Sequence, residues 1–190
     1  MAASRLLSYI RSMKPDEANE GNEDDSRLIV LVAYEDFAAA IRAMAMLKRV
    51  GNQCGQQARL IPLIGRFDVL ADDSYFELAV GDALAADIIV ISAREGKTLP
   101  QKIREWIAHW LLVEDRRPPA LVATLDYHPV RMKRQSCVLP YLAKLAHYGN
   151  MPFFANDGDR ASGIDPAPIS VRHSSSGQLL PGEPVHCDLF

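Results

Sequence analysis

Three groups of polar residues follow apolar stretches of this sequence and could bind a ligand. The largest is SAREGKT, residues 92–98; the others are residues 34–36 and Asp126. A small number of charged groups, hydroxyls and backbone amides beside an apolar core is the usual composition of a ligand site. The residues that we consider candidates for such a site are Tyr34, Ser92, Arg94, Glu95, Gly96, Lys97, Thr98 and Asp126.

Simpler interpretations exist for some of these charges. Arg94, Glu95 and Lys97 form a turn of mixed charge, which favours a solvated loop over an anion-binding site. Asp36 stands directly before a helical pattern, so its position predicts a helix N-cap rather than a metal ligand. Trp106 and Trp110 lie in the apolar stripe of a later helical pattern and should pack in the core.

A separate basic group occurs in HPVRMKRQSC, residues 128–137. It contains Arg131, Lys133 and Arg134, and it is the one concentrated basic patch of the sequence. Such a patch could bind a phosphate or an acidic partner segment, including the acidic residues near the start of this chain. The alternative is an ordinary solvated loop, which charged loops usually are.

The sequence offers little support for catalysis or for a metal site. Ser92, Asp126 and His128 could converge, but no G-x-S-x-G turn is present to expose the serine. The five histidines include no H-x-x-x-H or H-E-x-x-H spacing, so we predict no metal site. The three cysteines are too few and too scattered for a disulfide framework, which favours a reducing cytoplasm.

Alternating apolar runs and helical patterns predict the elements that would position these residues. We expect strands at 27–34, 58–64, 87–93, 119–126 and 151–157, with four helices between them. Five strands joined by helices indicate a three-layer, doubly wound α/β fold with a five-stranded parallel sheet. The flavodoxin-like strand order 2-1-3-4-5 would place Pro62 on an edge strand, where a missing N–H costs little.

In this architecture a ligand binds beyond the carboxyl ends of the strands, where the strand order reverses. The loops at that edge are residues 34–36, 92–98, 126–136 and 156–157. The first two flank the reversal itself, which is why we place the candidate site there.

Composition divides the chain into three parts. Residues 1–26 should be a flexible acidic leader in which residues 4–13 could form a short helix. Residues 27–157 form the flavodoxin-like domain, and residues 158–190, rich in Gly, Pro and Ser, should be a disordered or loosely packed tail.

Charge and hydropathy narrow the classes of partner. The net charge of −3 gives no electrostatic reason to expect nucleic acid or an anionic membrane. No apolar run approaches the ~20 residues that span a bilayer, so we expect no membrane-spanning segment. An edge strand at 151–157 that is followed by a long tail could support a homodimer.

The stretch ADIIVISAREGKTLPQKIREWI, residues 86–107, resembles the third strand and following loop of NADPH-dependent FMN reductases, which are relatives of flavodoxin. The likeness extends to PALVATLD and covers about 40 residues, most of them generic to this kind of fold. It implies that Ser92 and residues 94–98 would line the isoalloxazine ring of FMN. The sequence departs from that family at the phosphate loop, where YEDFAAA places two carboxylates instead of hydroxyls and amide groups.

Two further resemblances concern the whole domain. Glu35 and Asp36 are similar to the acidic pair of response-regulator receivers, but Ser92 replaces the acceptor Asp of that family, and residues 156–157 replace its Lys-Pro. RFDVLADDSYFELAVGDALAADIIVISA, LPQKIREWIAHWL and YLAKLAHYGNMPFF together resemble a group of uncharacterised bacterial flavodoxin-like proteins. That resemblance implies the fold and no activity.

The sequence therefore predicts a cytoplasmic flavodoxin-like binding or regulatory module without a recognisable catalytic group. Its partner would be a protein or a small molecule, and a cofactor is not expected. The alternative is an FMN-dependent NAD(P)H oxidoreductase with an unconventional phosphate site.

Overall fold

A computed structural model describes residues 2–13, 27–55, 58–94, 98–113, 117–126 and 137–156. All of them belong to one compact unit, Met1–Gly158. A second unit, Asp159–Phe190, lies outside the described residues, and so do residues 14–26 of the expected leader. The expectations of a flexible leader and a disordered tail therefore stay predictions.

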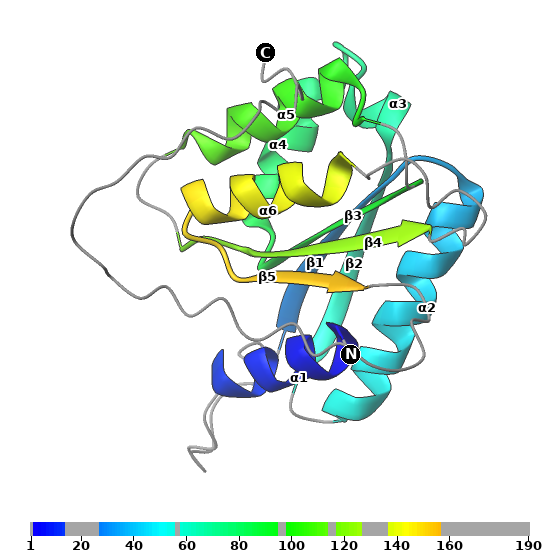
Figure 1. The fold of residues 1–190 in the computed structure, drawn as a ribbon, viewed down its shortest axis with the longest axis vertical. Coiled ribbons are helices and arrows are strands. Elements are labelled where there is room, and N and C mark those ends of the chain that lie inside the picture. The colour runs from blue at the N-terminus through cyan, green and yellow to red at the C-terminus, as the bar shows by residue number, and fades with distance from the viewer. Residues whose placement is uncertain are drawn as a thin grey trace, which may run out of the picture. The chain divides into compact units, whose positions relative to one another are not determined.

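Five parallel strands form one sheet in the order β2-β1-β3-β4-β5, which confirms the predicted fold and strand order (Figure 1). Pro62 lies on the edge strand, as predicted. The strands are β1 (Arg27–Tyr34), β2 (Arg59–Arg66), β3 (Ile88–Arg94), β4 (Ala120–Asp126) and β5 (Phe153–Asn156).

Helices cover both faces of the sheet (Figure 1). The four predicted crossover helices are present, and two further helices are added: α1 before the sheet and the short α3 directly after β2. Among the described residues, no helix has both the length and the apolar character needed to cross a membrane. The helices are α1 (Ala2–Met13), α2 (Phe37–Cys54), α3 (Phe67–Leu70), α4 (Phe76–Ala85), α5 (Gln101–Leu111) and α6 (Val138–Tyr148).

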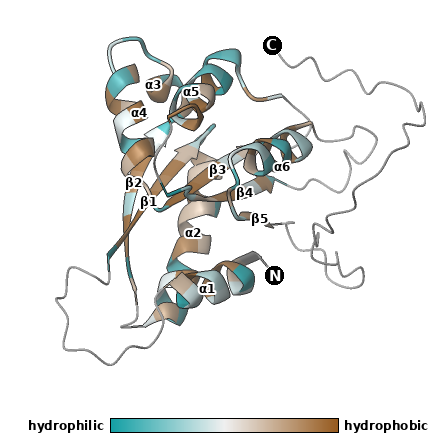
Figure 2. Ribbon diagram, turned by 90° about the vertical axis from the view of Figure 1, so that its left-hand side faces the viewer, coloured by the Kyte–Doolittle hydropathy of each residue, from teal (hydrophilic) through white to brown (hydrophobic). Residues whose placement is uncertain are grey.

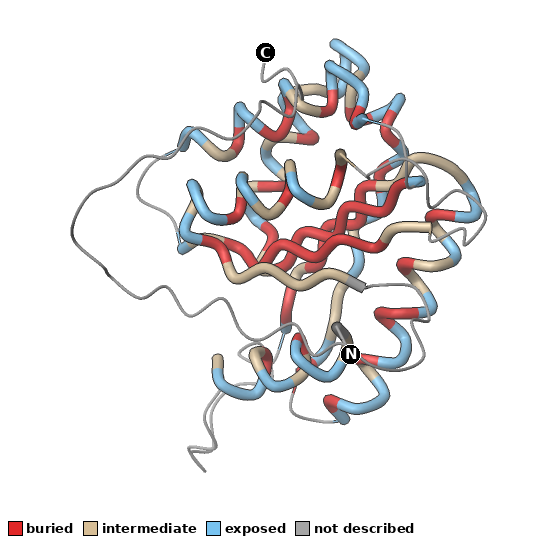
Figure 3. The backbone as a smooth tube through the Cα atoms, in the orientation of Figure 1, coloured by how far each residue is buried: buried red, intermediate tan, exposed pale blue. Residues whose placement is uncertain are grey.

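The core consists of two apolar clusters, one on each face of the sheet. Ile89 and Ile91 of β3 pack toward α3 to α6 together with Trp106 and Trp110, which confirms the predicted packing of both tryptophans. The alternate side chains of β3 face α1 and α2 instead. The central strands are buried along most of their length (Figure 3), and hydrophobic residues predominate in them (Figure 2). Burial on both faces is the reason that these strands are continuous apolar runs.

Helix α1 packs against elements that lie far from it in the sequence. Its contacts are with α2 and β5, and the Tyr9 and Phe154 rings lie 5.6 Å apart between centroids. Leu6 and Ile10 are 0% and 1% exposed in the cluster that also contains Cys54. The stretch considered for a short helix thus lies within α1, and this helix is part of the core.

Asp87 ties together the amino ends of three strands. Its carboxylate accepts a hydrogen bond of 2.8 Å from the backbone N–H of Ile29, and its own N–H donates to the Ile29 carbonyl at 2.9 Å. The Asp87 carbonyl accepts from Ala120 N–H at 2.9 Å. The Ala-Asp pair in the stretch that resembles FMN reductases therefore has a structural role here, far from the carboxyl ends of the strands.

Removal of the Leu6 side chain should destabilise the whole domain. Leu6→Ala leaves a cavity between α1, α2 and the sheet, so we expect a loss of about 2–5 kcal/mol in the free energy of unfolding. Chemical denaturation by urea measures it. Ser4→Ala, on the exposed side of the same helix, is the control and should leave the transition almost unchanged. An unchanged transition for Leu6→Ala would contradict the packing of α1.

The reactivity of Cys54 should report the same packing. Burial raises the pKa of this thiol, and the positive charge of Arg11 opposes the shift only in part. A raised pKa lowers the fraction of thiolate, so we expect slow alkylation by iodoacetamide at about pH 8. Mass spectrometry should show faster labelling of Cys54 in Leu6→Ala than in the unmodified protein; equal rates would show that α1 does not protect it.

Candidate functional site

The carboxyl ends of the strands bring the first candidate residues together. β1 ends at Tyr34 and β3 at Arg94, and the strand order reverses between these two strands. Tyr34 pairs in register with Ser92, and Ser92 with Thr124 of β4. The loops after β1 and β3 are therefore neighbours, as the fold prediction requires.

Arg94 bridges these two loops. Its guanidinium donates to one Glu35 carboxylate oxygen from Nε at 3.0 Å and from Nη2 at 2.7 Å, and its backbone N–H donates to the other at 2.8 Å. Nε also lies 3.3 Å from the Asp36 carboxylate. The hydrogen bonds that Arg94 donates to the Glu35 carboxylate raise the pKa of Arg94, so the arginine stays charged. We call these contacts of Arg94 with Glu35 and Asp36 the Arg94 bridge.

Asp36 also caps helix α2. Its second carboxylate oxygen accepts a hydrogen bond of 2.9 Å from the backbone N–H of Ala39, which confirms the predicted N-cap. A helix N-terminus can bind a phosphate because its first N–H groups have no partner within the helix. Here Asp36 occupies one of them. The next residue, Phe37, points to solvent with 79% of its surface exposed.

Ser92 is turned into the protein. The residue is 0% exposed, and its hydroxyl lies 2.8 Å from the Ala39 carbonyl and 3.3 Å from the Thr124 carbonyl. The hydroxyl has one proton to donate, and the shorter contact is the better acceptor. Ser92 therefore joins β3 to the first turn of α2 and does not reach the surface.

Arg42 also lies at the carboxyl ends of the strands, and the interpretation of the sequence missed it. It donates from Nη2 to the Ala93 carbonyl at 3.2 Å, and its Nη1 lies 3.8 Å from the Asp126 carboxylate. Arg42 is the one charged residue in the first three turns of α2. A lone charge on an otherwise apolar helix stretch was the signal that could have identified it.

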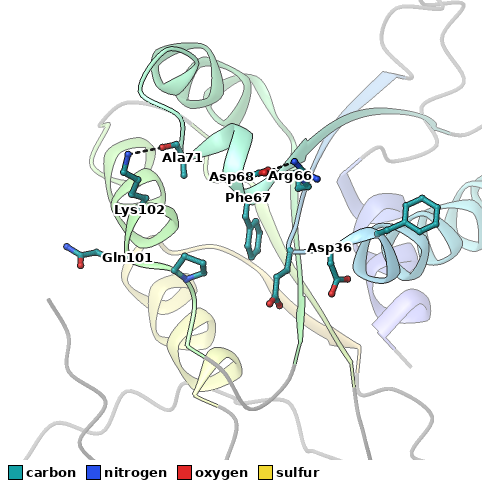
Figure 4. A pocket seen from close by; sticks show the side chains of 10 residues that line it. Asp36, Arg66, Phe67, Asp68, Ala71, Gln101 and Lys102 are labelled. Atoms are coloured by element: carbon teal, nitrogen blue, oxygen red, sulfur yellow. Dashed lines mark hydrogen bonds and ion pairs between the residues drawn. The ribbon is translucent and has the colours of Figure 1, made fainter.

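An open groove of about 590 Å³ lies beside the Arg94 bridge. Phe67, which is 5% exposed, points into it from the end of β2, between the start of α5 and the loop after β1 (Figure 4). The residues that line the groove are Glu35, Asp36, Phe37, Arg66, Phe67, Asp68, Ala71, Pro100, Gln101 and Lys102.

The positive charges at the rim of the groove already have carboxylate partners. Arg66 binds Asp68 through two hydrogen bonds of 2.6 and 2.5 Å. Lys102 donates to the Asp73 carboxylate at 3.0 Å and to the Ala71 carbonyl at 3.3 Å. The groove thus combines apolar walls with a rim in which these charges are compensated.

The structure places the candidate residues in different surroundings. Tyr34 is half-buried, Thr98 is exposed, and neither lines the groove. Asp126 lies beside Arg42, on the face of the sheet that α2 covers. The candidates outside the described residues stay predictions; they are Glu95, Gly96, Lys97, Arg131, Lys133 and Arg134.

Metal ligands do not gather in the part of the chain that the structure describes. Within it, no group of three or more His, Cys, Asp or Glu side chains is placed to hold a metal ion. Glu35 and Asp36 instead contact the guanidinium of Arg94, which supplies the positive charge for both carboxylates.

Loss of the Asp36 cap should weaken the domain through helix α2. Asp36→Ala leaves the Ala39 N–H without its acceptor, so we expect the free energy of unfolding to fall by about 1 kcal/mol. Urea denaturation gives this value. Asp73→Ala removes only an exposed contact with Lys102 and is the matched control, with almost no expected change. Equal effects of the two substitutions would argue against the cap.

Comparisons of this chain with protein-family models, with curated proteins and with solved structures found no match. What the chain does is therefore inferred from the geometry at the carboxyl ends of the strands, which we call the carboxyl edge.

Proposed function

We propose that this protein is a cytoplasmic binding or regulatory module that recognises its partner through the groove at the carboxyl edge. The partner would be a small molecule or a segment of another protein.

The Arg94 bridge is the observation that carries the proposal. In related architectures the crevice between the loops after β1 and β3 receives the ligand. In this chain Arg94 spans the two loops and binds Glu35 and Asp36. A phosphate would have to displace Asp36 from the α2 N-terminus and break its contact with Arg94, so phosphate-bearing cofactors are disfavoured.

The groove itself is suited to a neutral apolar or aromatic group. Phe67, Ala71 and Pro100 provide apolar surface, while Arg66 and Lys102 are held by carboxylates. Apolar walls with a few fixed polar groups are typical of binding pockets. Such a group would gain free energy by burial without the need to separate an ion pair.

The polar groups near the groove support binding better than catalysis. The Ser92 hydroxyl donates into the protein interior, and Glu35 already accepts three hydrogen bonds from Arg94. A nucleophile or general base must reach the reacting atom. These two groups are held away from that task.

The alternative function is an FMN-dependent NAD(P)H oxidoreductase. One observation favours it: Arg94 compensates the two carboxylates that would otherwise repel a flavin phosphate. The phosphate would then require a site other than the N-terminus of α2, where Asp36 binds Ala39.

Titration with FMN separates the two functions. We expect no saturable quenching of flavin fluorescence up to about 1 mM protein and no flavin retained after desalting. Asp36→Ser keeps a capping oxygen and removes the charge, so it is the matched variant. Micromolar binding of FMN by the unmodified protein would contradict the proposal and support the oxidoreductase.

A neutral aromatic probe tests the groove directly. We expect indole to shift the NMR amide signals of Phe67, Ala71 and Lys102, with weaker binding in Phe67→Leu because the aromatic contact is lost. Leu112→Ala, at an exposed residue that does not line the groove, is the control. Absence of shifts at these amides would argue against the groove as a binding site.

A further inference from the structure

The outward face of α2 is apolar where a surface helix is normally polar. The exposed positions of its first three turns are Phe37, Ala38, Ile41 and Ala45, and Lys48 is the first polar residue on this face. Phe37 and Ile41 are 79% and 54% exposed. Figure 3 shows exposed residues on the outer side of α2, the helix labelled in Figure 1.

Helices α1 and α5 do not share this property, whereas α4 also exposes an apolar residue, Leu78. The exposed face of α1 carries Ser4, Arg5, Ser8 and Arg11, and that of α5 carries mostly amide, charged and histidine side chains. Isolated exposed apolar residues are common, but neighbouring ones on one face indicate an interaction site.

The edge strand also carries exposed apolar residues. Ile64 of β2 is 53% exposed, and Pro62 is exposed as well. Ile64 pairs in register with Val32, whose side chain packs on the face that α2 covers. Side chains in register on adjacent parallel strands point to the same face, so Ile64 lies on the α2 side of the sheet.

We propose that this face of α2 is a homodimer interface, in which α2 of a second copy packs antiparallel to it. The exposed residues Ala38, Ile41, Ala45, Lys48 and Asn52 follow the alternating spacing of three and four that two packed helices use. An antiparallel pair centred between Ile41 and Ala45 places each Ile41 against an Ala45 of the other copy. A large side chain then meets a small one on both sides of the twofold axis.

The distribution of charge along α2 favours a second copy of this chain as the partner, with the two helices antiparallel. The residues before α2 are Glu35 and Asp36, which keep a net charge of −1 after pairing with Arg94, whereas its second half carries Lys48 and Arg49 and no acidic residue. Antiparallel packing brings the acidic end of each helix toward the basic half of the other, and it also aligns the helix dipoles favourably. Parallel packing would place like charges together.

This arrangement also affects the carboxyl edge. Phe37 belongs both to the apolar face and to the lining of the groove. A second copy would therefore place the basic half of its α2 near the acidic loop after β1, so the rim of each groove would include residues from both copies.

Sedimentation analysis over a concentration range tests the dimer. We expect reversible dimerisation of the unmodified protein and an affinity at least about tenfold lower for Ile41→Glu, which places a charge in the centre of the interface. Leu78→Glu, at a residue of α4 that is 65% exposed, is the matched control and should dimerise normally. Both substitutions are at exposed positions, and thermal unfolding checks that each variant is folded. A monomer at about 500 µM unmodified protein, or equal dimerisation of Ile41→Glu, would overturn the proposal.

Crosslinking tests the antiparallel orientation. At about 1.5 Å rise per residue, two copies of position 45 lie about 6 Å apart along the helix axes, and two copies of position 52 about 27 Å apart. A short bismaleimide should therefore link dimers of Ala45→Cys and leave those of Asn52→Cys at the level of the unmodified protein. Equal crosslinking of both variants would overturn the antiparallel packing.

Discussion

The pairing of β1 with β3 is the interaction on which the rest of the structure depends. These two strands are joined in register from Val30 and Ile88 to Tyr34 and Ser92, although the whole of α2, β2, α3 and α4 separates them in the sequence. Their pairing makes the strand order reverse at the middle of the sheet. It also brings the residue after β1, Glu35, within reach of the last residue of β3, Arg94. The character of the carboxyl edge follows from that proximity.

At this edge the polar groups are mostly bound to one another. Arg94 bridges two loops, Arg42 reaches toward Asp126, and the Ser92 hydroxyl donates to the first turn of α2. Paired charges of this kind contribute more to the orientation of a bound partner than to its affinity, because the partner must compete with interactions that are already made. Under the proposed function, recognition depends on apolar surface and shape, which the groove and the outward face of α2 both provide.

The fold could be predicted from the sequence because its determinants are local. Continuous apolar runs indicate strands buried on both faces, and the spacing of Asp36 to the helix that follows was enough to predict the cap. The candidate site was harder to predict because its contacts are long-range. Arg94 resembles part of a solvated turn in the sequence, and its partner Glu35 lies 59 residues earlier in the chain. The packing of α1 was missed for the same reason, since a short amphipathic pattern does not reveal which surface it covers.

The position of α1 has a consequence for the order in which the chain is completed. This helix precedes every strand of the sheet in the chain, yet Tyr9 contacts Phe154 in β5. Its apolar side chains remain without their final cover until nearly the whole domain has left the ribosome. Closure of the domain thus brings α1 against β5, and contacts so distant in sequence form slowly because a long loop must be closed first. A nascent chain that stops before β5 would lack the contact of Tyr9 with Phe154 and leave that part of α1 uncovered.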